Sequence, residues 1–272
     1  MRVSCFADEI APALKDQFRV MKELGLRSME IRTVDDIGVM DLSQKVLFDV
    51  RKQADDRGIA ITCVSSPIGK QPVASPVAQV VEELKSAADR AHIFGCKYIR
   101  IFSFFNVEGL SKDEAFSLSV EKLILMAEEA QKAGLTLVME GGHRTVGGTA
   151  KDALKLFKAV GNDHLKCAFD AGACIGAKEH PFTDCLPLLL PYIEYMHIKD
   201  AKFGAEGRVV PGEGDAQLEK ILDAIRDIDM ILSLEPHLAY AGANRGFSGE
   251  EPFKRAHKAL IDMLHRLSIG YI

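Results

Sequence analysis

The stretch Tyr195-Met196-His197-Ile198-Lys199-Asp200 decides how the rest of the chain is interpreted. It is a short apolar run that ends in a histidine, a lysine and an aspartate. A strand buried on both faces is apolar throughout, so polarity confined to its end is a separate signal. In a parallel α/β sheet, ligands and catalytic groups lie at the carboxyl ends of the strands. The stretch therefore predicts a buried parallel strand with a functional site at its end.

Three other apolar runs end in the same way. Residues 136–140 end at Glu140, residues 166–170 at Asp170 and residues 230–235 at Glu235. With His197, these residues are separated by 30, 27 and 38 positions, each about one strand–helix unit of a barrel. Since consecutive strands of a barrel are neighbours, we expect the four side chains to form an arc at its mouth. The alternative is that they are ordinary polar residues that cap neighbouring helices.

Composition and charge are typical of a soluble α/β protein with a sizeable core. The chain has 272 residues, of which 47% are hydrophobic and 27% charged, and its net charge is −5. We therefore expect no nucleic-acid partner and no membrane association, and no apolar stretch is long enough to span a bilayer. The N-terminus lacks the apolar core of a signal peptide, which predicts a cytoplasmic protein. The six cysteines form no C-x-x-C pair and are predicted to be reduced, structural thiols.

Strand and helix signals alternate along the whole chain, and several helices stop at a glycine. Eight strand–helix pairs fit a (β/α)8 TIM barrel of the α/β class. An open doubly wound sheet is the alternative, but the segment after the first strand lacks the glycine-rich phosphate-binding pattern of that fold. No linker divides the chain, so we predict a single domain over residues 1–272. The predicted strands are 3–6, 28–31, 59–64, 98–102, 135–140, 165–170, 195–199 and 230–235, and the predicted helices are 11–24, 43–57, 76–94, 112–133, 150–160, 181–190, 216–227 and 250–267.

Three carboxylates and one imidazole form an oxygen-rich set of candidate metal ligands. Such a set favours Mn²⁺, Mg²⁺ or Co²⁺ over Zn²⁺, because structural zinc prefers sulfur and nitrogen. A divalent ion stabilises the negative charge that develops when a proton is removed next to a carbonyl, and a carboxylate can take that proton and return it. Return to the neighbouring carbon isomerises a sugar, return to the opposite face epimerises it, and loss of a β-hydroxyl dehydrates it. The residues leave these three outcomes open.

Several motifs together resemble the sugar phosphate isomerase/epimerase superfamily, which is the group of xylose isomerase-like TIM barrels. This group includes ketose 3-epimerases, hydroxypyruvate isomerase, inosose dehydratase and endonuclease IV, and the resemblance covers nearly the whole chain. It implies a divalent metal held by Glu140, Asp170, His197 and Glu235, with Glu140 and Glu235 moving protons on opposite faces of the substrate. The motifs are His197-Ile198-Lys199-Asp200, Leu234-Glu235-Pro236-His237, Phe169-Asp170-Ala171-Gly172, Ser66-Pro67-Ile68-Gly69-Lys70, Glu30-Ile31-Arg32 and Glu140 at its strand end.

Further residues near the predicted mouth are candidates for substrate binding. The resemblance implies that His237 lies beside the metal and that Arg208, in the loop after the seventh strand, contacts substrate. Lys199 is either a substrate contact or the partner of a neighbouring carboxylate. Lys70 and Arg100 are either substrate contacts or members of structural ion pairs at the barrel mouth. The predicted substrate-binding residues are His143, Lys199, Arg208, His237, Lys70 and Arg100.

Two positions depart from the pattern of the resembled superfamily. Ala173 stands where many relatives carry a histidine, and Gly141-Gly142-His143 replaces an asparagine–histidine pair. The expected function is a metal-dependent isomerase or epimerase of a small sugar or keto-polyol. A dehydratase of the inosose or dehydroshikimate type and a non-catalytic sugar-binding barrel are the alternatives, and a homo-oligomer stays open. The acidic balance, the absence of tryptophan and the few histidines at the mouth disfavour a nuclease.

Overall fold

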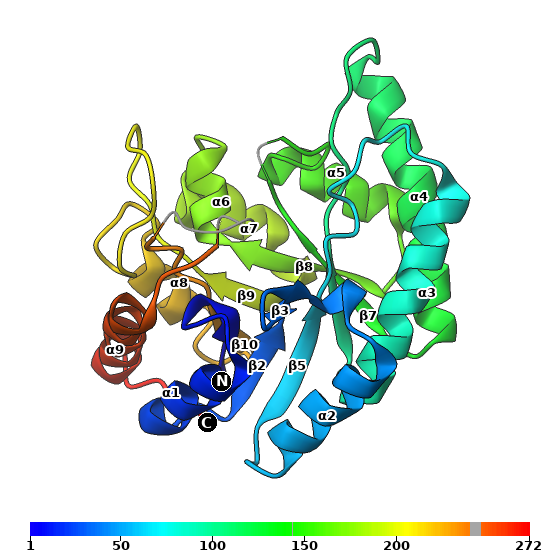
Figure 1. Cartoon of the computed structure of the whole chain (residues 1–272). Helices are drawn as coiled ribbons and strands as arrows, with labels where there is room; N and C mark the ends of the chain where they lie inside the picture. The colour runs from blue at the N-terminus through cyan, green and yellow to red at the C-terminus, as the bar shows by residue number, and fades with distance from the viewer. Residues whose placement is uncertain (143, 240–245) are drawn as a thin grey trace.

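In the computed structural model, eight parallel strands form one sheet that curls into a nearly closed barrel (Figure 1). The structure describes residues 1–142, 144–239 and 246–272. The strand order is β1-β10-β9-β8-β7-β6-β5-β2, and a parallel bridge between Phe6 and Glu30 joins the first strand to the last. The predicted (β/α)8 fold is therefore confirmed. The strands are β1 (Arg2–Cys5), β2 (Ser28–Ile31), β5 (Ala60–Ser65), β6 (Tyr98–Ile101), β7 (Thr136–Glu140), β8 (Leu165–Asp170), β9 (Ile193–Ile198) and β10 (Ile231–Leu234).

Helices surround the sheet, and each long helix buries one face against it. In the first helix the buried positions include Leu14, Phe18 and Met21, which recur at helical spacing. Ser111 and Glu114 form a reciprocal capping box at the start of the longest helix. A short antiparallel pair, β3 (Thr33–Val34) and β4 (Ile37–Gly38), lies outside the barrel sheet. The helices are α1 (Leu14–Leu24), α2 (Gln44–Asp55), α3 (Val77–Phe94), α4 (Lys112–Lys132), α5 (Ala150–Val160), α6 (Ala171–Gly176), α7 (Leu186–Leu189), α8 (Leu218–Ala224) and α9 (Glu250–Arg266).

The region after β8 differs from its prediction. The sequence predicts one helix over residues 181–190, and the structure is helical over this span, but as three pieces: a π-helical turn (Pro181–Cys185), the short α7 and a 3-10 turn (Leu190–Tyr192) follow one another there. The structure also has α6, which the sequence does not predict. The α6 helix begins directly at the strand end because Asp170 Oδ1 accepts a hydrogen bond from Ala173 N at 2.9 Å. Pro187 and Pro191 lack backbone N–H groups, which prevents one continuous α-helix.

Alternation along β9 sends its residues to two different environments. Met196 and Ile198 pack in the core between the sheet and the helices, whereas Tyr195 packs inside the barrel. Tyr195 Oη forms a hydrogen bond with Thr62 Oγ1 at 2.8 Å, and the ring of His197 lies edge-on to the Tyr195 ring, with centroids 5.8 Å apart. The side chains that point into the barrel are therefore Tyr195, which lies deepest, then His197, and then Lys199 at the mouth.

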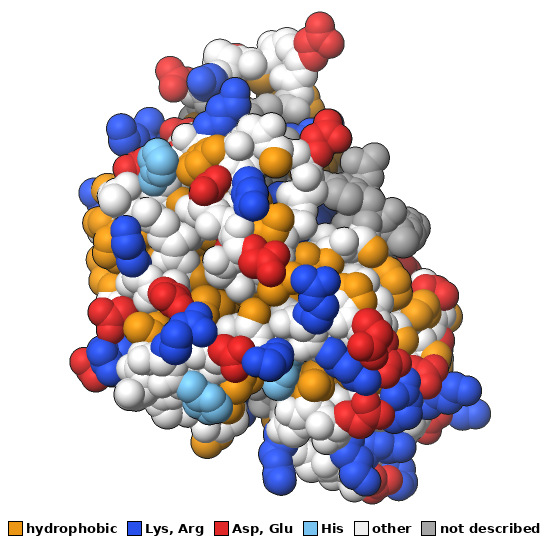
Figure 2. All heavy atoms as spheres, turned by 90° about the vertical axis from the view of Figure 1, so that its left-hand side faces the viewer, with side chains coloured by type: hydrophobic (Ala, Val, Ile, Leu, Met, Phe, Trp, Pro, Cys, Tyr) orange, Lys and Arg blue, Asp and Glu red, His pale blue; other side chains and the backbone are white. Residues whose placement is uncertain are grey.

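The face of the molecule drawn in Figure 2 carries interspersed basic and acidic side chains. The helices α1 and α9 are joined by ion pairs between Arg19 and Glu250 at 2.6 Å and between Lys254 and Glu23 at 3.0 Å. Exposed pairs of this kind contribute little to stability.

Among the described helices, none combines the length and apolar character that a membrane crossing requires. All six cysteines are free thiols, as the sequence predicts.

Replacing Gly69 by alanine is expected to destabilise the fold by about 3 kcal/mol, from left-handed backbone strain and overpacking together. Gly69 has a φ of +86°, and a Cβ there would lie 2.0 Å from the carbonyl oxygen of Phe102. The two segments are fixed to one another, because Phe102 N donates to Ile68 O at 2.8 Å and Phe104 N to Gly69 O at 2.9 Å.

The matched control is Gly25→Ala, at a glycine with a φ of +72° and nothing within 4 Å of an added Cβ. This substitution adds only backbone strain, so the expected loss is about 1 kcal/mol. Urea unfolding of the two variants measures the difference. Equal losses of free energy would contradict the close approach of the two segments.

Candidate metal centre

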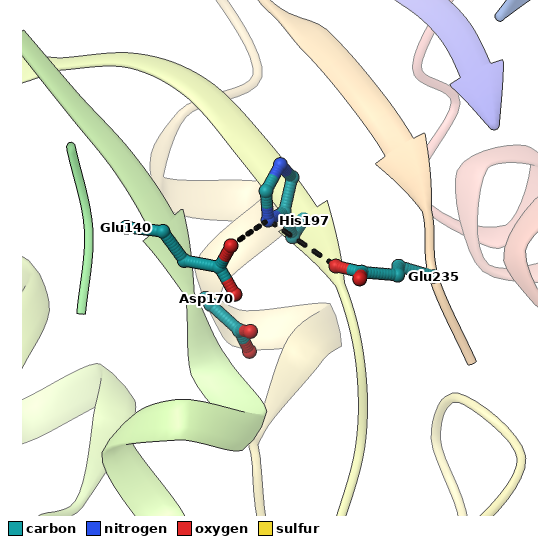
Figure 3. A group of neighbouring side chains, drawn as sticks. All are labelled: Glu140, Asp170, His197 and Glu235. Atoms are coloured by element: carbon teal, nitrogen blue, oxygen red, sulfur yellow. Dashed lines mark ion pairs between the residues drawn. The ribbon is translucent and has the colours of Figure 1, made fainter. Parts of the chain in front are cut away.

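The four residues predicted as metal ligands come together at the mouth of the barrel. Glu140 ends β7, Asp170 ends β8, His197 lies within β9, and Glu235 directly follows β10. One ligand atom from each residue lies within 4.8 Å of the others, and all four residues are buried. Figure 3 shows the carboxylates of Glu140 and Glu235 flanking the His197 ring from either side. The predicted arc is present, and only Asp170 among the four also caps a helix through its side chain.

The ring of His197 lies between carboxylates at both of its nitrogens. Its Nε2 is 3.2 Å from Glu30 Oε1, and its Nδ1 is 3.3 Å from Glu235 Oε2 and 3.7 Å from Glu140 Oε2. Ser65 Oγ donates to Glu30 Oε2 at 2.5 Å, which holds that carboxylate behind the ring. Burial alone would lower the pKa of His197, but Glu30 and Glu140 outweigh it and raise the pKa to about 10. A carboxylate behind a histidine fixes the ring so that the other nitrogen faces a metal.

Three buried atoms of this group lack a hydrogen bond of normal geometry: His197 Nδ1, His197 Nε2 and Glu235 Oε2. Each has only a charged neighbour. His197 Nε2 lies 3.2 Å from Glu30, His197 Nδ1 lies 3.3 Å from Glu235 Oε2, and Lys199 Nζ lies 2.6 Å from the same Glu235 oxygen. Buried polar atoms without regular hydrogen bonds are uncommon and require an explanation. An imidazole nitrogen and a carboxylate oxygen are both ligand atoms, and Glu140 and Asp170 add two more oxygens beside them. The donor set therefore fits a divalent cation.

Two arginines hold the remaining oxygens of the central glutamates. Arg100 Nη1 donates to Glu140 Oε2 at 3.1 Å, and Arg32 Nη1 donates to Glu235 Oε1 at 3.1 Å. The Arg100–Glu140 contact is the mouth ion pair that the sequence offers as the alternative role of Arg100. Burial would raise the pKa of Glu140, but Lys199 and Arg100 outweigh it and lower the pKa well below its ordinary value. Lys199 and His237 do the same for the pKa of Glu235. Both carboxylates are therefore ionised.

Lys199 extends into the same group of carboxylates. Its Nζ lies 2.6 Å from Glu235 Oε2, 2.7 Å from Asp170 Oδ2 and 3.3 Å from Glu140 Oε1. Burial would lower the pKa of Lys199, but Asp170 and Glu140 outweigh it and raise the pKa. The structure thus shows Lys199 as a carboxylate partner, which is one of the two roles that the sequence leaves open.

A further acidic group beside the centre is missed by the sequence analysis. Glu9, in a 3-10 turn after β1, accepts hydrogen bonds from His237 N at 2.8 Å and from Ser248 Oγ at 2.6 Å. Its Oε1 lies 3.1 Å from His237 Nε2, which also lies 3.0 Å from Glu235 Oε1. Asp8, the preceding residue, accepts from Arg32 Nε at 2.7 Å. Polarity at the end of the first strand is the signal that would have found this pair.

The remaining predicted substrate residues lie around the centre. A Cβ placed on Gly172 would be 3.3 Å from Asp170 Oδ1 and 3.5 Å from Arg208 Nε, so Arg208 stands beside Asp170. Arg208 Nε is buried without a hydrogen-bond partner. Lys70 Nζ lies 4.4 Å from the centroid of the Phe102 ring.

Two further sequence observations concern neighbouring segments. Predicted residue His143 lies outside the described residues. Ala173, where many relatives carry a histidine, lies in α6 and contributes its backbone N–H to Asp170. This position therefore adds no side-chain ligand to the centre.

Comparison with known proteins places this fold in a family. The family model described as xylose isomerase-like TIM barrel matches residues 18–263. No curated protein sequence matches the chain. A solved D-tagatose 3-epimerase-like protein has a TM-score of 0.81 at 18% identity, with 98% of each chain covered. The IOLI protein with a bound zinc atom has a TM-score of 0.78 at 19% identity, covering 98% of this chain and 99% of that one.

A third solved structure, the probable 3-DHS dehydratase AsbF from Bacillus anthracis, has a TM-score of 0.76 at 18% identity. The match covers 96% of this chain and 99% of that one. Identities this low show a shared fold, while the family model covers most of the chain. The chain therefore belongs to the xylose isomerase-like TIM barrel family.

Proposed function

We propose that this protein is a divalent-metal-dependent isomerase or epimerase of a small sugar or keto-polyol. The observation that carries the proposal is the convergence of three buried carboxylates and the His197 ring within 4.8 Å of one another at the mouth of the barrel. The structural likeness to an epimerase-like protein and to IOLI supports it. Glu140, Asp170, His197 and Glu235 are the proposed ligands.

The proposed chemistry needs two carboxylates placed around one substrate. When bound, the divalent ion would supply Lewis-acid stabilisation of the negative charge that develops on the substrate. Glu140 and Glu235 come from β7 and β10 and flank the His197 ring (Figure 3). A substrate between them would face one carboxylate on each side. Each carboxylate would take or return a proton next to the carbonyl. One carboxylate serving two carbons gives isomerisation, and two serving opposite faces give epimerisation.

The oxygen-rich ligand set suits Mn²⁺, Mg²⁺ or Co²⁺. Zinc belongs in the same panel, because the similar IOLI structure holds a zinc atom. Metal content of the purified protein, and the stoichiometry of each ion after reloading, would identify the preferred cation.

A dehydratase that uses the same centre is the second candidate. Lys199 carries an ammonium group at the mouth, beside all three carboxylates, and in this alternative it would donate the proton to the departing hydroxyl. Loss of a hydroxyl requires such a proton donor. The likeness to a probable dehydratase supports this alternative.

Incubation in D₂O tests the proposal directly. The metal-loaded protein is incubated with a panel of ketoses and hydroxy-ketones, and NMR follows deuterium at the carbon next to the carbonyl. Exchange with a new sugar as product indicates an isomerase or epimerase, whereas an unsaturated product indicates a dehydratase. Ligand binding without exchange would instead indicate a non-catalytic sugar-binding barrel and would overturn the proposed activity.

Lys70 is expected to make substrate binding depend on pH. Its burial, with the nearby charge of Arg100, lowers the pKa of Lys70 to about 8. The ammonium form is therefore lost as the pH rises through 8. If Lys70 contacts substrate in its charged form, KM should rise about tenfold between about pH 7 and pH 9. The Lys70→Arg variant should lack this rise, because a guanidinium stays charged. Parallel KM profiles for the two proteins would exclude the charged contact.

A further inference from the structure

We infer that Lys199 is an internal cation that competes with the divalent ion for the same carboxylates and is displaced when the ion binds. The inference rests on the proposed metal site, and it assigns to that site a built-in competitor that sets its affinity. The two roles that the sequence leaves open for Lys199 then belong to two stages of one cycle. Lys199 pairs with the carboxylates before the ion binds, and it is available to contact substrate at the barrel mouth afterwards.

The geometry of Lys199 overlaps that of the proposed ligand set. Its Nζ contacts Asp170 at 2.7 Å, Glu235 at 2.6 Å and Glu140 at 3.3 Å, so it uses three of the four residues that converge there. The overlap reaches individual atoms. Glu235 Oε2 lies 2.6 Å from Lys199 Nζ and also 3.3 Å from His197 Nδ1. The oxygen best placed to join His197 as a metal ligand is thus the one on which the ammonium lies.

Electrostatics makes joint occupation costly. A divalent ion bonds carboxylate oxygen at about 2.1 Å, so an ion on Glu235 Oε2 and an ammonium still 2.6 Å from that oxygen would lie at most about 5 Å apart. The repulsion between a doubly and a singly charged cation at this distance is large in a buried site. Glu140 and Glu235 cannot readily turn away from the site, because Arg100 and Arg32 donate hydrogen bonds to their other oxygens. Lys199 is the member of the group that is free to leave.

The backbone beside Lys199 is fixed, so displacement of its ammonium requires movement of the side chain alone. The next residue, Asp200, accepts hydrogen bonds from the backbone N–H groups of Gly212 at 2.8 Å and Ala216 at 3.1 Å, which anchors the loop. Lys199 lies one residue beyond the end of β9, on a flexible four-carbon stem. A Cβ on Gly172 would come within 2.9 Å of Lys199 Cβ, so the glycine of α6 leaves the space that the base of the lysine side chain occupies. Only the outer part of the stem needs to turn for the ammonium to leave the carboxylates.

The test compares metal affinity in variants that keep or remove the charge. Mn²⁺ binding to the full chain is measured by chelator competition in wild type, Lys199→Met and Lys199→Arg. Removal of the competing charge should raise the affinity of Lys199→Met at least tenfold, while Lys199→Arg should bind no more tightly than wild type. Lys122→Met is the control, because Lys122 is also a buried lysine but contacts the ring of Phe104. Its Mn²⁺ affinity should equal that of wild type.

The outcomes separate this inference from the proposed function. Unchanged or weaker Mn²⁺ binding by a folded Lys199→Met variant, with wild type binding normally, would overturn the competition and leave the metal site intact. Failure of every protein to bind Mn²⁺ or Zn²⁺ would overturn both. Tight binding by Lys199→Met alone would support the competition most strongly.

A second measurement uses wild type and does not depend on the folding of a variant. Lys199 is 4% exposed, so its amine should resist reductive methylation without added Mn²⁺. Displacement by Mn²⁺ should expose the amine and raise the extent of its labelling, read by mass spectrometry of the peptide that contains it. Lys122 in the same digest provides the internal reference. Equal labelling of Lys199 with and without saturating Mn²⁺ would overturn displacement.

Discussion

A His197→Ala variant is expected to bind the divalent ion about 100-fold more weakly, or worse, and to lose measurable turnover. Removing only the partner behind a metal-bound histidine commonly costs 10- to 100-fold in affinity, so loss of the ligand itself should cost at least as much. His197 is the only nitrogen donor in the group of four. Its Nδ1 faces Glu235 at 3.3 Å and Glu140 at 3.7 Å, so its removal also leaves those carboxylates without their shared neighbour.

Metal content after dialysis and Mn²⁺ titration of the refilled protein measure this loss. His92→Ala is the matched control, because His92 is an exposed histidine of α3 whose ring contacts the backbone oxygen of Ala133. This control should retain the metal affinity of wild type. Since His197 is fully buried, thermal unfolding must show that the variant is folded before its metal content is interpreted. Full metal retention by a folded His197→Ala protein would exclude the proposed ligand set.

The convergence of the four side chains could be predicted because each of them carries a local signal. Glu140, Asp170, His197 and Glu235 each interrupt an apolar run at its carboxyl end, and a parallel barrel brings such ends together. The inward direction of Lys199 also follows from its place two residues after His197. These features depend on the period of one strand and on the order of neighbouring strands, both of which are visible in the sequence.

The surroundings of the centre depend on contacts between distant segments, which no local pattern encodes. Arg32 follows β2 and reaches Glu235 beyond β10, while Glu9 follows β1 and reaches His237. Glu30 comes from the far side of the barrel to stand behind His197. These pairings depend on how β1 and β2 close the barrel, which rests on a bridge between Phe6 and Glu30.

The irregular helical region after β8 and the unpredicted α6 have local causes. The apolar residues between 181 and 190 have helical spacing, which favours one continuous helix. Two other features of the sequence prevent a single regular helix in this region. Asp170 starts α6 immediately after the strand through its side-chain cap, and prolines at 187 and 191 interrupt the later hydrogen bonds. The same Asp170 thus shapes the backbone after β8 and contributes an oxygen to the centre.

The second large effect is expected for Glu140→Gln and Glu235→Gln, each of which should slow the conversion of substrate sugar into product about 1,000-fold at saturating metal. General acid–base groups typically contribute 10²- to 10⁴-fold. Glutamine keeps one oxygen that can serve as a ligand but cannot take up a proton at neutral pH. Metal binding is therefore expected to weaken while still reaching one ion per chain at high concentration, which separates loss of the base from loss of the cation.

Asp170→Asn is the matched control for these two variants. Asp170 belongs to the same group of four, and asparagine can still cap α6. Because Asp170 is proposed as a ligand and not as a base, its variant should lose metal affinity but recover most of its rate of sugar conversion at saturating metal. Equal losses in all three variants under saturation would contradict the assignment of Glu140 and Glu235 as the groups that move protons.

The pattern of residual exchange also distinguishes the two proposed reactions. Glu140 and Glu235 approach His197 Nδ1 from two sides (Figure 3). In an epimerase, each carboxylate serves one face, so Glu140→Gln should still exchange the proton of one epimer and Glu235→Gln that of the other. In an isomerase, a single carboxylate carries the proton between two carbons, so one variant alone should abolish exchange of both sugars. Deuterium incorporation from each pure sugar, followed separately in D₂O, decides between these patterns, and only the two-sided pattern is compatible with opposite-face proton transfer.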